Sequence, residues 1–493
     1  RLTASSTVLR ATVFLSGVAL ALTGCVKNAD QSHSISDQQN VDYPEFARVL
    51  NTAGATTSPD AYSSFAFNVP TPGMTDEENE LHLKGDFEFN RQFNTEGGVG
   101  PAFNANSCIA CHARDGRGAL PILAAGESKV KLGANESLLL RISLEPEGQP
   151  PMLVPGFAEQ LYHRGIYSLR PDSPGTGQAD VEMSFEFSTF TYPDGRTVEL
   201  RKPIFTITNA YDAIDGKPSQ LANPDLRVSP RIGPPMIGLG LLEAIDARDI
   251  LALADPDDRD GDGISGRANF IGGKLGRFGW KANTTSIREQ VAGALSNDMG
   301  LRNSVFPLEN INGTSLFTSL IERLGELWKP LETEIKEDTL HALEFYSATL
   351  AVPARRDIDN PRVLRGAKTF ETIGCTSCHA PKFRTSDRAA SPALRGIEIY
   401  PFSDGLLHDM GEELADNRRD HEADGREWKT RPLWGIGLTQ TINPRAGFLH
   451  DGRARTLEEA ILYHGGEAAE IRSRFVHLDA SKRAELLAFL SSL

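Results

Sequence analysis

The stretches Cys108-Ile109-Ala110-Cys111-His112 and Cys375-Thr376-Ser377-Cys378-His379 each place two cysteines three positions apart and a histidine directly after them. On a helical turn, residues three apart share one face, so both thiols can bond to the vinyl groups of one porphyrin edge. The adjoining imidazole then reaches the iron, and this C-x-x-C-H spacing is typical of c-type haem attachment. We therefore expect two covalently bound haem c groups, attached through Cys108, Cys111, Cys375 and Cys378, with His112 and His379 as iron ligands.

Three alternatives to haem attachment are a zinc site, a thioredoxin-like redox pair and a chance occurrence of the pattern. Zinc held by two C-x-x-C pairs does not require a histidine directly after each pair. The 11 histidines in 493 residues amount to about 2% per position, so both pairs would be followed by histidine by chance roughly once in 2,000 cases. Of the five cysteines only Cys25 stands outside the two pairs, and such short-range pairs do not build a disulfide framework.

The amino-terminal residues 1–24 have the pattern of a secretory signal, because an apolar run over residues 11–23 follows basic residues. The run is shorter than the roughly 20 apolar residues that span a bilayer. It ends in Leu22-Thr23-Gly24-Cys25, which resembles a bacterial lipobox. We therefore expect lipidation of Cys25 and a periplasmic protein that is attached to a bacterial membrane by its lipid anchor. The alternative is a plain signal peptide that happens to precede a cysteine.

The rest of the chain divides into a tether and two haem domains. Residues 25–75 are rich in Ser, Thr, Asn, Asp and Pro, so we expect a flexible tether with a short helix at 43–50. The remaining length fits two domains, given about 150 residues per domain as a prior. The proline-containing segment 353–361 is the predicted boundary, which gives a first domain at 76–354 and a second at 355–493.

Composition and charge restrict the classes of partner. Hydrophobic residues make up 40% of the chain and charged residues 24%, as in soluble globular proteins. The net charge of −15 argues against binding to DNA or RNA, because nucleic-acid sites need positive charge. A protein partner that docks through charge should therefore be basic.

The pattern of elements predicts a mainly α fold. Helical apolar spacing occurs at residues 363–373, 457–464 and 481–493, and only Pro193-Asp194-Gly195 gives a strong hairpin signal, between strands at 181–192 and 196–208. A glycine and an aromatic residue precede each cysteine pair, in Gly366-Ala367-Lys368-Thr369-Phe370 and Gly85-Asp86-Phe87-Glu88-Phe89. We therefore expect an internal duplication, with two cytochrome c-like domains and a small β-hairpin insert between the haem sites.

Seven further stretches carry a family resemblance, at residues 100–104, 115–118, 234–245, 260–267, 278–281, 448–453 and 456–460. Together with the cysteine pairs they resemble the bacterial di-haem oxidoreductase family, whose members are labelled thiol oxidoreductases and are related to di-haem cytochrome c peroxidases. The resemblance runs from about residue 85 to the end of the chain. It implies two cytochrome c-like domains, an aromatic residue between the haems, either Trp280 or Trp434, and a small cytochrome or cupredoxin as electron donor.

The second ligand of each iron decides between electron transfer and catalysis. For the second haem we predict Met410, while His408, His450 and His464 remain alternatives. For the first haem no methionine or histidine is well placed, which favours an open iron. The resemblance to peroxidases then implies Glu243, in Gly240-Leu241-Leu242-Glu243-Ala244, as the catalytic group that transfers a proton to bound peroxide.

Residues 258–264 begin like a calcium-binding loop, because Asp258, Asp260 and Asp262 alternate with other residues before a glycine. The twelfth position is Asn269, so the usual bidentate glutamate is missing. A calcium ion and a metal-free turn therefore both remain open.

These features leave three functions open. The first is an enzyme that accepts electrons at a closed second haem and reduces peroxide or a related oxidant at an open first haem. The second is an electron carrier without a substrate, and the third is a redox partner linked to iron uptake. Thiol oxidation is not favoured, because all four paired cysteines are needed for haem attachment.

Overall fold

The computed structural model describes residues 42–133, 137–166, 169–170, 177–213, 216–325 and 333–493. The predicted signal segment and the lipidation site at Cys25 lie outside these residues. Residues Tyr43–Leu493 form one compact unit. The boundary between two haem domains at residues 353–361 stays a prediction. In the described part of the chain, no helix combines the length and the apolar character needed to cross a membrane.

The prediction of a mainly α protein is wrong. Helices account for 31% of the residues and strands for 17%, and the strands form several small sheets. Most of these strands contain only two or three residues, which is too short for an alternating pattern to show in the sequence. Only the hairpin around Pro193-Asp194-Gly195 has a clear sequence signal. Its two strands have 12 residues each and pair along their whole length, so the hairpin is larger than the small insert that the sequence predicts.

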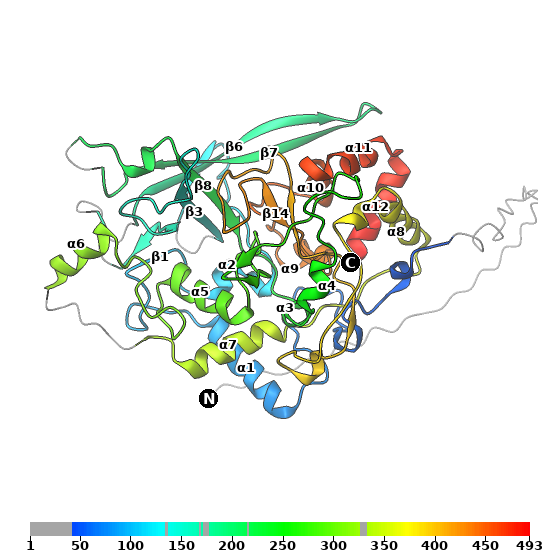
Figure 1. Cartoon of the computed structure of the whole chain (residues 1–493), viewed down its shortest axis with the longest axis horizontal. Coiled ribbons are helices and arrows are strands. Elements are labelled where there is room, and N and C mark those ends of the chain that lie inside the picture. Colours follow the sequence, from blue (N-terminus) through cyan, green and yellow to red (C-terminus); the bar gives the residue numbers. More distant parts are fainter. Residues whose placement is uncertain (1–41, 134–136, 167–168, 171–176, 214–215, 326–332) are drawn as a thin grey trace, which may run out of the picture. The chain divides into compact units, whose positions relative to one another are not determined.

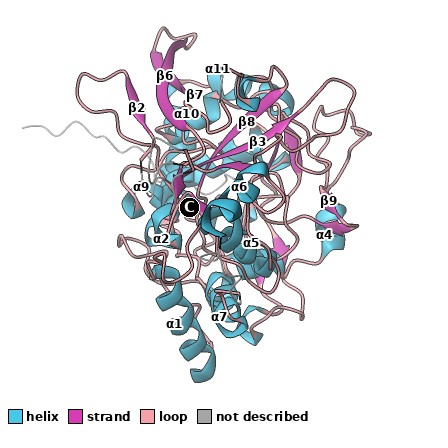
Figure 2. Cartoon of the chain, turned by 90° about the vertical axis from the view of Figure 1, so that its left-hand side faces the viewer, coloured by secondary structure: helices cyan, strands magenta, loops and turns pink. Residues whose placement is uncertain are grey.

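Within the described residues, the strands form two three-stranded sheets and four two-stranded ones. The hairpin strands β6 and β7 pair from Asp180↔Thr208 to Thr191↔Thr197, and β2 lies at the outer edge of β6. The second sheet has the order β4-β3-β8. Figure 2 shows β3, β6, β7 and β8 above helices α1 and α7. The strands are β1 (Ala102–Phe103), β2 (Lys129–Lys131), β3 (Leu138–Leu144), β4 (Gln160–Leu161), β5 (Arg164–Gly165), β6 (Asp180–Thr191), β7 (Thr197–Thr208), β8 (Leu226–Ile232), β9 (Phe270–Ile271), β10 (Lys274–Leu275), β11 (Phe383–Arg384), β12 (Glu398–Ile399), β13 (Leu407–Asp409) and β14 (Glu427–Lys429).

In Figure 1, helix α2 lies near the centre of the view, and helices α8 and α12 lie together to its right. The first pair lies on α2, and the second lies on a single 3₁₀ turn, Cys375–Ser377, directly after α8. The α-helices are α1 (Asp76–Asn90), α2 (Cys108–Cys111), α3 (Leu239–Glu243), α4 (Ala247–Leu251), α5 (Ile287–Met299), α6 (Ser315–Leu324), α7 (Glu337–Ala348), α8 (Pro361–Thr372), α9 (Thr439–Ile442), α10 (Leu457–Leu462), α11 (Ala469–His477) and α12 (Ala480–Ser492).

The predicted duplication appears as two matching helix crossings. Helix α1 packs against α7, and a Cβ atom on Gly85 would lie 2.2 Å from the carbonyl oxygen of Ala342. Helix α8 packs against α12, and a Cβ atom on Gly366 would lie 2.0 Å from the carbonyl oxygen of Glu485. At both crossings the two helix backbones are therefore so close that only glycine, which has no Cβ atom, fits at the contact.

Part of the predicted tether is structured. Residues 45–48 form a 3₁₀ helix, and Phe46 is buried in edge-on contact with Phe370 and Phe402. The Arg355 guanidinium donates to the carbonyl oxygen of Phe46 over 2.7 Å. Residues from Tyr43 onward thus belong to the folded body, although their composition alone indicated a flexible segment.

The close helix crossing predicts a specific loss of stability. Gly366→Ala should lower the free energy of unfolding by about 1–3 kcal/mol, because the new methyl group must displace the backbone of α12. The matched control is Gly293→Ala in α5, where the nearest atom to a new Cβ is a Phe306 ring carbon at 3.8 Å. That variant should gain roughly 0.5–1 kcal/mol from its higher helix propensity. Equal stability changes in urea unfolding of the two variants would contradict the close crossing.

Candidate functional site

The first site is built around α2 and His112. The His112 Nδ1 atom lies 2.7 Å from the carbonyl oxygen of Pro234, so an Nδ1 proton can be donated there. This bond fixes the imidazole and leaves Nε2 for a metal, which is how iron-binding histidines are usually oriented. The Phe89 ring lies 6.2 Å from the imidazole, at an interplanar angle of 50°. Phe89 follows Gly85 by one helical turn, so the α1–α7 crossing positions it.

The second site repeats this arrangement with different residues. The His379 Nδ1 atom lies 2.9 Å from the carbonyl oxygen of Phe402. The Phe370 ring lies 6.2 Å from the imidazole, at an interplanar angle of 49°. Phe370 follows Gly366 by one helical turn, so the α8–α12 crossing positions it in the same way. The two predicted iron ligands therefore have the same kind of backbone hydrogen bond and the same aromatic neighbour.

The electrostatics of the sites suit haem attachment and not thiol redox chemistry. Burial lowers the pKa of His112 and of His379 to about 4, so both imidazoles are neutral, as metal ligation requires. Burial also raises the pKa of the Cys108 and Cys375 thiols to about 12. A thioredoxin-like pair needs a lowered thiol pKa. Among the described residues, the two cysteine pairs do not meet in one metal-binding cluster, which argues against zinc.

A cavity of about 840 Å³ lies beside Cys108, Cys111 and His112. Residues of α5 form one wall, and Trp280 borders the cavity as well. Arg431 also lines it and has no acidic partner among the described residues, and burial lowers its pKa to about 10. A buried guanidinium without a counter-ion suits the carboxylates of haem propionates. The residues present therefore fit a haem.

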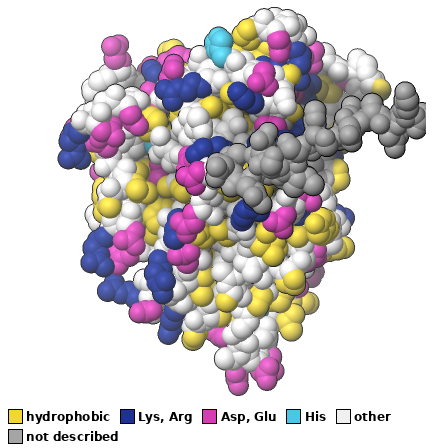
Figure 3. Space-filling model, turned by 90° about the vertical axis from the view of Figure 1, so that its right-hand side faces the viewer, with side chains coloured by type: hydrophobic (Ala, Val, Ile, Leu, Met, Phe, Trp, Pro, Cys, Tyr) yellow, Lys and Arg dark blue, Asp and Glu magenta, His cyan; other side chains and the backbone are white. Residues whose placement is uncertain are grey.

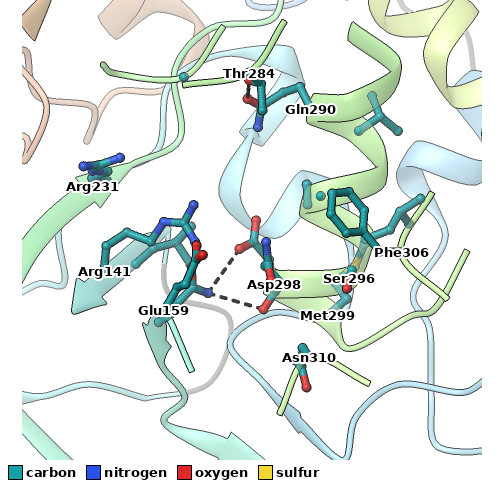
Figure 4. Close-up of a pocket in the computed structure, with 18 of the residues that line it drawn as sticks. Arg141, Glu159, Arg231, Thr284, Gln290, Ser296, Asp298, Met299, Phe306 and Asn310 are labelled. Atoms are coloured by element: carbon teal, nitrogen blue, oxygen red, sulfur yellow. Dashed lines mark hydrogen bonds and ion pairs between the residues drawn. The ribbon is translucent and has the colours of Figure 1, made fainter. Parts of the chain in front are cut away.

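Asp298 and Gln290, which the sequence patterns did not single out, bring polar groups into this cavity (Figure 4). The Asp298 carboxylate accepts a hydrogen bond from Gln160 Nε2 over 3.1 Å, and burial raises its pKa to about 6. Gln290 accepts from Thr284 Oγ1 over 2.7 Å. Both residues lie on α5, about two turns apart. Their sequence neighbours give no sign that these two side chains face a cavity.

Glu243, the predicted catalytic acid, has a different environment. Its carboxylate accepts the backbone N–H of Ile287 over 2.8 Å and thereby caps the first turn of α5. Burial raises the pKa of Glu243, but the residue is absent from the described residues that line the cavity. Asp298 is therefore part of the cavity wall, whereas Glu243 is not among the described residues that line it.

The candidates for the second ligand of the second haem occupy different surroundings. His408 is held between two carboxylates, with Nε2 2.8 Å from Asp404 and Nδ1 2.7 Å from Glu467. His450 stacks on Trp428 at a centroid distance of 3.8 Å. Met410 is partly buried against the core that also contains Cys375. His464 has its Nδ1 atom 2.8 Å from the carbonyl oxygen of Ala460.

Of the two predicted bridging aromatics, Trp280 lies in a series of ring contacts that leads away from the first cavity. Its ring meets His450 edge-on at 6.5 Å, and His450 stacks on Trp428. Trp428 pairs with His408 across β13 and β14, and His408 Nδ1 lies 3.6 Å from Cys378 Sγ. Trp434 instead packs in a separate apolar cluster beside Gly238.

The predicted calcium loop has its three carboxylates together. Ligand atoms of Asp258, Asp260 and Asp262 all lie within 4.8 Å of one another, and all three residues are exposed. Asn269, at the twelfth position, is buried and donates to the carbonyl oxygens of Lys281 and Asp420. The loop therefore lacks its closing ligand, and calcium stays a prediction.

Comparison with known proteins agrees with this geometry. The family model described as "Di-haem oxidoreductase, putative peroxidase" matches residues 46–493. No curated protein matches the sequence. Among solved structures, the chain is similar to a chain of Kuenenia stuttgartiensis hydrazine synthase pressurized with 20 bar xenon, at 20% identity over 52% of this chain and 87% of that chain. Its TM-score of 0.22 is too low to support an argument. Because the family model spans almost all of the described residues, this chain belongs to the di-haem oxidoreductase family and is a haem oxidoreductase.

Proposed function

We propose that this chain is a c-type di-haem enzyme that reduces peroxide, or a closely related oxidant, at its first haem. The observation that supports this is the cavity beside His112, which contains a buried carboxyl group with a pKa of about 6. An electron carrier without a substrate also needs room for its haem, but it needs no proton-transferring carboxyl group such as Asp298 beside that haem. Haem iron held by His112 would supply the electrons that break the oxygen–oxygen bond.

Covalent attachment is supported by the position of the thiols. Cys108 and Cys111 bracket one turn of α2, and the amide N–H of His112 donates to the carbonyl oxygen of Cys108 over 2.9 Å. The amide of His379 makes the equivalent 3.0 Å bond to Cys375. Each turn thus presents two thiols and one imidazole together.

Asp298 is the group that we assign to proton transfer. Reduction of hydrogen peroxide to two water molecules consumes two electrons and two protons. The Asp298 carboxylate can take the proton from the peroxide oxygen that is attacked and return it to the oxygen that departs. The amide of Gln160 holds the carboxylate in place, and the carboxamide of Gln290 on the same helix can orient the peroxide.

Electrons would enter at the second haem and pass to the first. The contacts from Cys378 through His408, Trp428 and His450 to Trp280 support such a route, because they connect the second cysteine pair with the wall of the cavity. Trp280 is oriented by a hydrogen bond from its Nε1 to the carbonyl oxygen of Ile232 over 2.9 Å.

The proposed donor is a small cytochrome or cupredoxin, in a periplasm where the lipidated Cys25 would keep the enzyme at a membrane. The sequence supports this through its signal-like segment and its net charge of −15. Acidic and basic side chains are interspersed on the face shown in Figure 3. Because the chain carries an overall excess of negative charge, an electron donor with a basic docking surface is favoured.

Covalent attachment predicts a mass that survives denaturation. The unfolded holoprotein should retain the mass of two haems in mass spectrometry. Replacement of Cys108 and Cys111 by serine should remove one haem, since the thioether bonds to that porphyrin are lost. A wild-type protein that releases all its haem on unfolding would contradict covalent attachment.

The proposed role of Asp298 predicts a large loss of activity. Asp298→Asn should lower kcat/KM for peroxide-dependent oxidation of a reduced cytochrome by about 10²- to 10⁴-fold, because an amide cannot relay the proton. Both haems should remain attached. Glu243→Gln, which keeps an acceptor for the Ile287 N–H, should retain most of the activity. Loss in Glu243→Gln with full activity in Asp298→Asn would return the role to Glu243.

The raised pKa of Asp298 predicts a pH profile. The carboxylate form accumulates as pH rises through about 6, so kcat/KM should increase across this range and then level off. The inflection should disappear in Asp298→Asn. In the unfolded chain this carboxyl has the ordinary aspartate pKa of 3.8, so the residue should make the wild type less stable as pH rises from about 4 to 6. A profile that is flat through pH 6 would contradict the assignment.

A further inference from the structure

The duplication extends to the segments on the far side of each haem site. An isolated bridge joins Phe278 with Thr284 in the first half, and the Phe278 N–H donates to the Thr284 carbonyl over 3.0 Å. The same bridge joins Phe448 with Ala454, with a 2.8 Å hydrogen bond. The two turns have the same length and share this one hydrogen bond, from the first phenylalanine N–H to the carbonyl oxygen six residues later. They therefore give a register in which residues of the two halves can be matched.

The helices that follow these turns begin at matching positions. The Ser286 side chain caps α5 by accepting the N–H of Glu289 over 3.1 Å, and the Thr456 side chain caps α10 by accepting the N–H of Glu459 over 3.1 Å. The Glu289 carboxylate accepts the N–H of Thr285 over 2.9 Å. The Glu459 carboxylate likewise accepts the preceding N–H, from Arg455, over 2.7 Å. The first turn of α5 is thus the structural counterpart of the first turn of α10, whereas α5 continues for 13 residues and α10 ends after 6.

Counting eight residues from each cap reaches Ala294 in the first half and His464 in the second. Ala294 lines the cavity beside His112. The methyl group of alanine cannot bind iron and leaves room for a substrate. The position matched by this count in the second half, two residues after the end of α10, carries an imidazole, which is the commonest nitrogen ligand of haem iron.

The geometry of His464 suits iron ligation. Its Nδ1 atom faces the carbonyl oxygen of Ala460 at 2.8 Å, which orients the ring and leaves Nε2 as the acceptor nitrogen. Burial lowers the pKa of His464, so the imidazole is neutral. Glu467, three residues after His464, lies 2.7 Å from His408 Nδ1, and that nitrogen lies 3.6 Å from Cys378 Sγ, so the His464 segment lies close to the second cysteine pair.

The other candidates are less suitable. Both nitrogens of His408 are occupied by the carboxylates of Asp404 and Glu467. His450 is held between the rings of Trp428 and Trp280. Met410 lies beside the His464 segment, because a Cβ atom on Gly465 would come within 2.8 Å of the Met410 carbonyl oxygen.

We propose that His464 is the second axial ligand of the second haem, and that Ala294 leaves the matching position open at the first haem. This inference rests on the two-haem part of the proposed function and not on peroxide chemistry. A haem with two imidazole ligands has a lower reduction potential than one with imidazole and methionine. The donor must then be a correspondingly stronger reductant.

The test is spectroscopy of the ferric holoprotein and of three variants. In the wild type, the second haem should be low-spin and should lack the weak red charge-transfer band that a methionine–iron bond produces. His464→Ala should convert this haem to high-spin, and added imidazole should restore the low-spin signal. His464→Met should introduce the methionine band, whereas Met410→Leu should leave the wild-type spectrum unchanged.

Two results would overturn the assignment. The first is a methionine band in the wild type that disappears in Met410→Leu. The second is a second haem that remains low-spin in His464→Ala without added imidazole. Both measurements are independent of turnover, so an inactive protein with these spectra would refute peroxide reduction and leave the ligand assignment intact.

Discussion

The structure depends on two helix crossings in which a glycine lies directly against the backbone of another helix. Gly85 against α7 and Gly366 against α12 each fix a phenylalanine one turn later, and that ring packs beside the iron-binding histidine. Each histidine is then locked by a bond from Nδ1 to a backbone carbonyl. Contacts with backbone atoms thus fix the positions of both histidines without any contribution from a cofactor.

Two copies of one arrangement can carry out different tasks because a few side chains differ. In our proposal, the position for the second iron ligand carries a methyl group in the first half and an imidazole in the second, at Ala294 and His464. The first half also contains Asp298, a carboxyl group that stays protonated at weakly acidic pH because burial raises its pKa. The division between a reactive site and an electron-transfer site therefore needs no change of fold.

Much of the site could be predicted from sequence, because covalent and ligand chemistry require fixed spacings. The C-x-x-C-H stretches, the glycine before each and the hairpin at Pro193-Asp194-Gly195 all identify local structure. The short strands could not be foreseen, since two or three residues carry no periodicity. The sequence did not single out Asp298 as a cavity-lining residue, because tertiary packing decides which side chains reach a cavity. The turns that begin at Phe278 and Phe448 have the same length, and this repeat could have been used to align the two halves. In that alignment Ala294 is matched with His464.

One open and one closed haem within a single chain is the central claim. Its most direct test is electron paramagnetic resonance of the wild-type ferric protein, with integration of the high-spin and low-spin signals during titration with cyanide. We expect equal amounts of the two signals and conversion of the high-spin half by one equivalent of cyanide per chain. Two low-spin haems that do not bind cyanide would contradict the claim.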